Sequence, residues 1–399
     1  MDSAARSGYA LLLVAWFAWF WNFSYRMMVP ALLPAIQASL SLSNWMAGAL
    51  VGALNFGYAI SAYPSGLCSA RFGSGKIIAF GVALSASSMG LLSASGSYPA
   101  MVALAFAAGL GLGAYLPQGL ALLSERYGRR RRGAVIGIHE TAAPVGQAIG
   151  PLWAGAMLPS LGWAGCLRAW LPPAALIAVA FLSIAPGRRE GSKGDEGAPK
   201  GGGWSLGLYL AAMLLVSSVW SANLGLISMI PVYLVRSSLA DAALAAFLIG
   251  ATRFSGALGQ LTGGFLSDAI GRFKVLVAIV FVTAVSTAGV AFAPYGPAMV
   301  ASMVIQAMVT SAFFPVTFAA ISDNTSPGNR AKVIGMVNTS AGLLGGTLSP
   351  MIIGYLADGF DFQIAFLYPV LMGFLACPLV FYLRGRLHWA GGAGSERES

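Results

Sequence analysis

The sequence predicts an all-α integral membrane protein in which twelve transmembrane helices form two six-helix repeats. Hydrophobic residues make up 57% of the 399 residues and charged residues only 9%, whereas soluble domains carry about 25% charged residues. The apolar runs continue for roughly twenty residues, which suits helices that cross a bilayer and not the shorter alternating strands of a barrel. Finally, motifs of the first half return at one constant offset in the second half.

The apolar runs place the spans in order along the chain. The first run continues to about Leu40 with no small-residue cleavage site, so it reads as a span and not as a signal peptide. The later runs follow after short polar or glycine-containing interruptions. The twelve predicted spans are residues 8–38, 46–69, 76–96, 99–124, 133–158, 164–186, 204–235, 242–266, 273–294, 297–322, 331–357 and 363–385.

A polar, glycine-rich segment divides the chain after the sixth span. The sequence PGRREGSKGDEGAPKGGG at 186–203 has the composition of a flexible linker. It predicts an N-terminal six-helix half at 1–187, a linker at 188–203 and a C-terminal six-helix half at 204–399.

The net charge of +10 comes from basic clusters between the apolar runs, such as RYGRRRR at 126–132. They follow the even-numbered spans, so the positive-inside rule predicts a multi-pass protein of the cell membrane with both termini in the cytoplasm. The lipid bilayer, and not nucleic acid, is therefore the expected environment of these charges.

The two halves repeat at an offset of 198 residues. PAMVA at 99–103 returns at 297–301, VIGIHET at 135–141 meets VIGMVNT at 333–339, and Glu125 meets Asp323. Parallel six-span repeats with a site at mid-membrane are typical of one class of secondary transporters.

A loop motif carries the first family resemblance. GGFLSDAIGRFK at 263–274 resembles the G-x-x-x-D-x-x-G-R-x-K signature of the major facilitator superfamily, and GLCSARFGSGK at 66–76 is its partner copy with Ala70 in place of the acid. The glycines indicate tight turns, and an acid beside basic residues can form a charge latch; the alternative is that the basic residues only set topology. The predicted cytoplasmic gate residues are Gly66, Arg71, Gly73, Lys76, Gly264, Asp268, Gly271, Arg272 and Lys274.

Two arginines lie near the centres of predicted spans, Arg26 in the first and Arg253 in the eighth. Intramembrane charges mark substrate paths by default, and a guanidinium matches a carboxylate with two parallel hydrogen bonds. For Arg26 the alternative is an ion pair with Glu140. For Arg253 the alternatives are contacts with backbone carbonyls or a place in the wall of a water-filled cavity. Tyr25, Asn55 and Tyr115 complete the predicted substrate-binding set.

The surroundings of Arg26 carry a second resemblance. NFSYRMMVPALLPAIQ at 22–37 resembles the first span of organic-anion transporters of the same superfamily, with Tyr25 where their pattern has Asp. Arg253 resembles the anion-binding arginine of the oxalate, nitrate and monocarboxylate carriers. These resemblances imply an anionic substrate.

Glu140, beside His139, is the only carboxylate predicted well inside a span. A low dielectric suits reversible protonation of such a group, so both residues are candidates for proton coupling. The alternative is a Glu140 that nearby cytoplasmic arginines neutralise.

Together these patterns predict a monomeric secondary transporter that moves a small organic anion by alternating access, driven by protons. An efflux antiporter for drug-like apolar compounds and a non-transporting membrane sensor are the alternatives. No nucleotide-binding loop, nucleophile–base pair or metal-ligand spacing is present, and Cys68, Cys166 and Cys377 lie far apart, so the sequence predicts neither an enzyme nor a cofactor.

Overall fold

A computed structural model describes residues 3–127, 129–184 and 204–389, and every regular element in those residues is a helix. The helices of the first predicted half are α1 Ser3–Leu40, α2 Asn44–Phe72, α3 Ser74–Leu92, α4 Tyr98–Gly113, α5 Tyr115–Arg126, α6 Arg129–Glu140, α7 Ala142–Arg168 and α8 Leu171–Ile184. Their order follows the six predicted spans, because long apolar runs must satisfy their own backbone hydrogen bonds in lipid.

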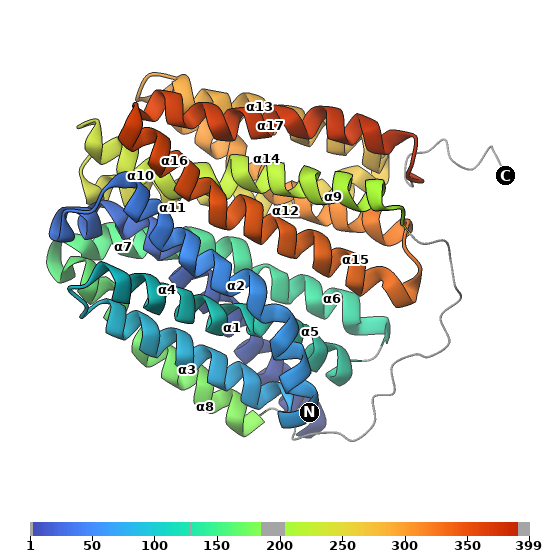
Figure 1. Cartoon of the computed structure of the whole chain (residues 1–399). Coiled ribbons are helices and arrows are strands. Elements are labelled where there is room, and N and C mark those ends of the chain that lie inside the picture. Colours follow the sequence, from blue (N-terminus) through green and yellow to red (C-terminus); the bar gives the residue numbers. More distant parts are fainter. Residues whose placement is uncertain (1–2, 128, 185–203, 390–399) are drawn as a thin grey trace. The chain divides into compact units, whose positions relative to one another are not determined.

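The second predicted half follows the same pattern. Its helices are α9 Leu206–Trp220, the π-helix η1 Ser221–Gly225, α10 Leu226–Arg236, α11 Ala242–Arg253, α12 Ser255–Ile270, α13 Arg272–Phe292, α14 Pro297–Asp323, α15 Pro327–Ser340, the π-helix η2 Ala341–Leu348, α16 Ser349–Gly359 and α17 Phe362–Arg384. Figure 1 shows these helices coloured along the chain; by their bounds, η1 joins α9 directly to α10, and η2 joins α15 directly to α16.

Ten helical stretches in the described residues are long and apolar enough to cross a membrane. One of them, Ala134–Ile184, is 51 residues long and holds two predicted spans, because α7 continues through a sharp bend at Gly162, where φ is 63°. The 38-residue α1 is not among the ten; Asn22, Ser24 and Arg26 interrupt its apolar sequence.

Several predicted spans are divided in the structure. The fourth breaks at Ala114, the fifth at Thr141 and the eighth at Phe254, while the seventh and eleventh pass through η1 and η2. Breaks and π-turns inside spanning helices are frequent at functional sites, and in this chain they lie beside the candidate residues described below.

Glycines bring pairs of helices into close contact, as the small-residue spacing predicts. The Cα of Gly150 in α7 approaches the backbone of Ser24 in α1, and Gly259 in α12 approaches the backbone of Met308 in α14 so closely that neither site has room for a Cβ. Gly150 therefore fixes how α1, the helix that carries Arg26, packs on α7.

Contacts divide the chain into two compact units. The first contains residues 1–192 with Pro231–Ala251, and the second contains residues 193–230 with Thr252–Ser399. Residues 231–251 group with the first unit because Gly250 in α11 packs on Leu152 in α7, and Arg236 donates to the carbonyl of Leu42 at 3.3 Å. The predicted linker at 188–203 lies outside the described residues.

Candidate functional site

Arg26 is buried in the first unit against two side chains of α2. It is 2% exposed; Nε and Nη2 donate to Oδ1 of Asn55 at 2.9 and 2.6 Å, and Cζ lies 4.0 Å from the centre of the Tyr58 ring. Asn55 donates its own amide to the carbonyl of Val51 at 3.0 Å, which fixes the amide orientation and points Oδ1 at Arg26. Neither of these two partners is a carboxylate, so these contacts orient the guanidinium through an amide oxygen and an aromatic ring.

Arg253 is held in a similar way in the second unit. It is 4% exposed; Nη1 donates to Oδ1 of Asn223 at 2.9 Å and Nη2 to Oε1 of Gln306 at 3.2 Å. Gln306 in turn donates to the carbonyl of Ala222 at 2.9 Å, so its oxygen is aimed by the same device as that of Asn55. Nε of Arg253 has no hydrogen-bond partner among the described residues, which leaves one donor for a ligand.

The two arginine–asparagine pairs are related by the sequence repeat, with the partners exchanged. Position 253 lies 198 residues after Asn55, and Asn223 lies one residue before the position that matches Arg26. In the first unit the arginine comes from the first helix of the repeat, and in the second unit it comes from the second helix. The repeat thus preserves an arginine held by a neutral amide while changing which helix supplies the charge.

The other two predicted substrate-binding side chains do not join Arg26. The hydroxyl of Tyr25 donates to the carbonyl of Leu167 at 3.0 Å, and its ring packs on Trp21 with 5.0 Å between centroids. The hydroxyl of Tyr115 lies against His139. Tyr25 points away from the guanidinium because neighbouring residues of a helix project about 100° apart.

The proton-coupling candidates form one hydrogen-bonded chain. Nδ1 of His139 lies 3.0 Å from Oε1 of Glu140, and Nε2 lies 2.9 Å from the hydroxyl of Tyr115, which donates to the carbonyl of Ala15 at 2.6 Å. The side chain of His139 is fully buried and that of Glu140 is 32% exposed. The ring of His139 lies 6.0 and 5.9 Å from the rings of Trp19 and Tyr115, whose own centroids are 5.3 Å apart, so the three rings form one cluster. Thus Glu140 has His139 as its described hydrogen-bond partner, and both residues share an electrostatic neighbourhood with Tyr115.

The predicted gate residues of the first unit lie at the α2–α3 turn. Gly73 has a φ of 90°, which explains why glycine is required there, and Gly66 has open space around its Cα. Arg71 and Lys76 are exposed. No ion pair links these two basic side chains to a carboxylate in the part of the chain that the structure describes.

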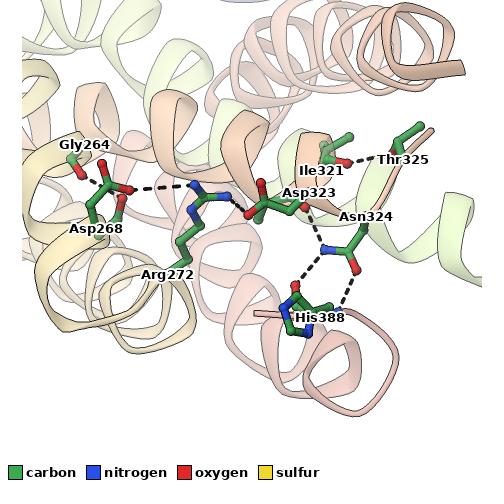
Figure 2. A network of polar contacts seen from close by, with 10 residues as sticks. Gly264, Asp268, Arg272, Ile321, Asp323, Asn324, Thr325 and His388 are labelled. Atoms are coloured by element: carbon green, nitrogen blue, oxygen red, sulfur yellow. Dashed lines mark hydrogen bonds and ion pairs between the residues drawn. The ribbon is translucent and has the colours of Figure 1, made fainter. Parts of the chain in front are cut away.

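The corresponding turn of the second unit holds a charge cluster (Figure 2). Gly271 repeats the turn with a φ of 98°. Arg272 lies between Asp268, at 3.7 Å, and Asp323 at the end of α14. The carboxylate of Asp268 is 73% exposed and that of Asp323 only 28%, so Asp323 is the more shielded partner. Gly264 has open space around its Cα, and Lys274 is exposed and outside the described ion pairs.

The same cluster continues towards the C-terminal end of the described chain. The side chain of Asn324 donates to the carbonyl of His388 at 2.7 Å and accepts from the backbone N–H of His388 at 2.6 Å. The backbone carbonyl of Asn324 accepts from the indole of Trp204 at 3.0 Å. Figure 2 shows Asn324 joined to His388, directly after Asp323. The start of α9 and the segment after α17 are therefore tied to the end of α14 that carries Asp323.

The different exposures of Asp268 and Asp323 predict which of the two contributes more to transport. We expect Asp323→Asn to reduce transport more than Asp268→Asn, because exposed ion pairs contribute about 0–1 kcal/mol and shielded ones more. Initial uptake rates in proteoliposomes, normalised to inserted protein, measure this order. Equal wild-type rates for both variants would reduce the motif to a topology signal.

Four side chains around the candidate site were not predicted. Tyr58, Asn223 and Gln306 are neutral residues inside spans, and no sequence pattern marks a neutral partner of an arginine. Asp323 could have been found, because the 198-residue offset pairs it with Glu125 at the end of the matching span.

Comparisons with known proteins identify the family and the fold. The sequence model of the Major Facilitator Superfamily matches residues 12–256 and again 226–397. A solved bacterial homolog to the human lysosomal transporter Spinster, in an inward-facing, unoccupied conformation, superposes with a TM-score of 0.81 over 96% of this chain and 97% of that chain, at 18% sequence identity. The all-helical fold of two six-helix repeats is therefore the major facilitator fold.

Curated relatives match with modest identity. A Bacillus subtilis protein named as a niacin/nicotinamide transporter is 26% identical over 77% of this chain and 78% of its own length. The 3-(3-hydroxy-phenyl)propionate transporter of Escherichia coli is 30% identical over 34% of this chain and 32% of its own length. The matches with two further relatives are also partial, since they span 22% and 32% of those proteins. Because the family model covers most of the chain, the chain belongs to the Major Facilitator Superfamily and is a multi-pass membrane protein.

Proposed function

We propose that this transporter moves a small organic anion of the carboxylate type across the cell membrane by alternating access, and that protons drive it. The observation that carries the proposal is the environment of the two buried arginines. Each guanidinium is oriented by amide oxygens that carry no negative charge. Nε of the buried Arg253 has no hydrogen-bond partner among the described residues, and a carboxylate ligand can accept from that donor and balance the buried charge.

The chemistry of the relatives supports the same class of substrate. Niacin and 3-(3-hydroxy-phenyl)propionate, named for two of the relatives, are both carboxylic acids with an aromatic ring, and nicotinamide, named beside niacin, is the corresponding neutral amide. A carboxylate can accept two parallel hydrogen bonds from one guanidinium. The proposal includes cytoplasmic termini, as the basic clusters indicate, and a monomer as the working unit.

Arg26→Lys and Arg253→Lys test the anion site. We expect each variant to bind and transport a carboxylate ~10–100-fold more weakly, since hydrogen bonds to charged groups contribute ~1.5–3 kcal/mol and lysine lacks the planar fork. Uptake of niacin and of an arylpropionate into proteoliposomes, with Kd values from calorimetry, measures the loss.

Arg168→Lys is the matched control, because Arg168 is an exposed arginine that donates to Ser93 at the end of α7. Normal carboxylate uptake by both Arg26→Lys and Arg253→Lys would place the anion site elsewhere. Transport of apolar cations in place of carboxylates would favour the drug antiporter, and binding without transport would favour the sensor.

A further inference from the structure

The hydrogen-bonded chain around His139 fixes where its protons must lie. The carbonyl of Ala15 can only accept a hydrogen bond. The Tyr115 hydroxyl, 2.6 Å away, therefore donates its single proton to that carbonyl. That hydroxyl can then only accept from His139, which places a proton on Nε2 of the imidazole at 2.9 Å. Tyr115 is 2% exposed and His139 is fully buried, so both groups lie away from bulk solvent.

The contact with Glu140 then requires one more proton. Nδ1 of His139 and Oε1 of Glu140 are 3.0 Å apart, and a hydrogen bond at that distance needs a proton on one of the two atoms. Either His139 is an imidazolium beside a carboxylate, or it is a neutral imidazole beside a carboxylic acid. In both cases the pair holds one proton more than a neutral imidazole beside a carboxylate, so the arrangement in the structure is the proton-loaded one.

Release of that proton to solvent through the partly exposed Glu140 leaves two arrangements. If the imidazole keeps its proton on Nε2, two acceptors face each other across 3.0 Å between Nδ1 and Oε1. If the proton stays on Nδ1, the bond to Glu140 survives, and Nε2 becomes an acceptor for the Tyr115 hydroxyl. The second arrangement keeps both bonds of His139 and gives up only the bond to Ala15.

We propose that the Tyr115 hydroxyl is a two-position switch, which donates to Ala15 when the His139–Glu140 pair holds its extra proton and to His139 when that proton has left. Ala15 belongs to α1, and Arg26 lies eleven residues further along the same helix, ~16 Å away at 1.5 Å per residue. Proton release therefore removes a hydrogen bond that fastens the helix of the arginine to α5. The transport role of this switch rests on the proposed function, whereas the switch itself does not.

Several other charged or titratable groups lie near the His139–Glu140 pair. The elements packed against α6 are α1, α5 and α7. Their titratable or charged side chains, within the described part of the chain, are Tyr9, Tyr25 and Arg26 in α1, Tyr115, Glu125 and Arg126 in α5, and Arg168 and Cys166 in α7. Among these groups Tyr115 makes the hydrogen bond to His139 and also interacts electrostatically with Glu140, and Tyr58 of α2 interacts with Glu140 in the same way. Gly119 keeps space for the Tyr115 ring, since a Cβ there would lie 2.9 Å from the ring carbon that bears the hydroxyl.

Infrared difference spectroscopy of the purified full-length protein in nanodiscs, titrated with pH without substrate, tests the switch. In wild type we expect one titration step in which the carboxylic acid or imidazolium band is lost and a tyrosine C–O band shifts. Tyr115→Phe should lose the tyrosine shift and keep the titration of the pair, and Glu140→Gln should lose both. Tyr98→Phe is the matched control, because the Tyr98 hydroxyl also donates to a helix carbonyl, that of Met46 at 3.0 Å; it should keep both.

A tyrosine shift that persists in Tyr115→Phe overturns the switch, as does a wild-type titration step with no tyrosine shift. The wild-type measurement decides the matter even where a variant folds poorly. A proteoliposome assay that shows no pH-driven uptake, while the spectra behave as expected, overturns the proposed proton coupling and leaves the switch standing.

Discussion

Asn55→Asp is expected to abolish anion binding while the first unit keeps its fold. The substitution replaces an amide by a carboxylate of nearly the same shape, and Oδ1 of residue 55 already lies 2.6 and 2.9 Å from two guanidinium nitrogens of Arg26. The new ion pair neutralises the charge that the proposed substrate is to balance. A carboxylate substrate then has to displace an internal carboxylate, and like charges repel it.

The expected loss exceeds that of Arg26→Lys. Arg26→Lys keeps the positive charge but loses the planar pair of guanidinium donors. Asn55→Asp neutralises the charge of Arg26 and also occupies those donors. Two unit charges 4 Å apart interact with ~4 kcal/mol at an effective dielectric constant of 20, so the loss in carboxylate affinity should reach about a hundredfold or more. Asn223→Asp should act in the same way on Arg253 in the second unit, where the distance to Oδ1 is 2.9 Å.

Calorimetric binding of a carboxylate and thermal unfolding of the same samples measure this prediction. Asn329→Asp is the matched control, because Asn329 is an exposed residue in the first turn of α15, where an acid is tolerated. If Asn55→Asp binds the carboxylate normally and unfolds like wild type, the charge of Arg26 takes no part in binding. A cationic ligand gained by the variant would support the role of charge at this position.

The sequence predicted the charges of this site better than their partners. Arg26 and Arg253 stand out because a charge inside an apolar run is rare, and Asn55 was predicted alongside them. Tyr58, Asn223 and Gln306 were not, because neutral polar residues are common in spans and their contacts depend on how helices pack. The exchange of partners between the units becomes visible only when contacts and the 198-residue offset are considered together.

The same division holds for the fold. The twelve spans were predictable because hydropathy and loop charges determine them. The breaks at Ala114 and Thr141 and the π-turns of η1 and η2 were not predicted, since they depend on which helix faces provide alternative hydrogen bonds. Two helices meet at Gly162, where φ is 63° and the backbone is not helical, so the predicted break between the fifth and sixth spans falls at this bend.

Tyr115 shows why a role is harder to predict than an element. The sequence placed it among the substrate-binding candidates, whereas the structure brings it to His139. That contact joins α5 to α6 across 24 residues, and its geometry depends on the helix break at Ala114, where α5 begins. No local sequence pattern predicts such a contact. The protonation of His139 and Glu140 could therefore be inferred only from the hydrogen bonds of the folded chain.

Glu140→Gln is expected to keep substrate exchange and to lose accumulation against a gradient. The side-chain amide introduced by this substitution can donate to Nδ1 of a neutral His139 while Nε2 still donates to Tyr115, so the variant reproduces the hydrogen bonds of the loaded pair without a proton that can leave. Exchange at equal substrate concentrations needs no proton release, whereas net accumulation does. The expected result is counterflow near the wild-type rate, with pH-driven accumulation reduced to equilibration.

Counterflow and net uptake in proteoliposomes, with and without an imposed pH gradient, separate the two activities. Asp361→Asn is the matched control, because Asp361 is an exposed acid that caps α17 through the N–H of Ile364 at 2.8 Å, and asparagine caps a helix equally well. Parallel losses of stability, binding and exchange in Glu140→Gln would show that Glu140 is a structural partner of the buried imidazole, since one member of a buried pair is then left alone. Full pH-driven accumulation by Glu140→Gln would remove Glu140 from the coupling mechanism and leave His139, or another ion, to carry the driving charge.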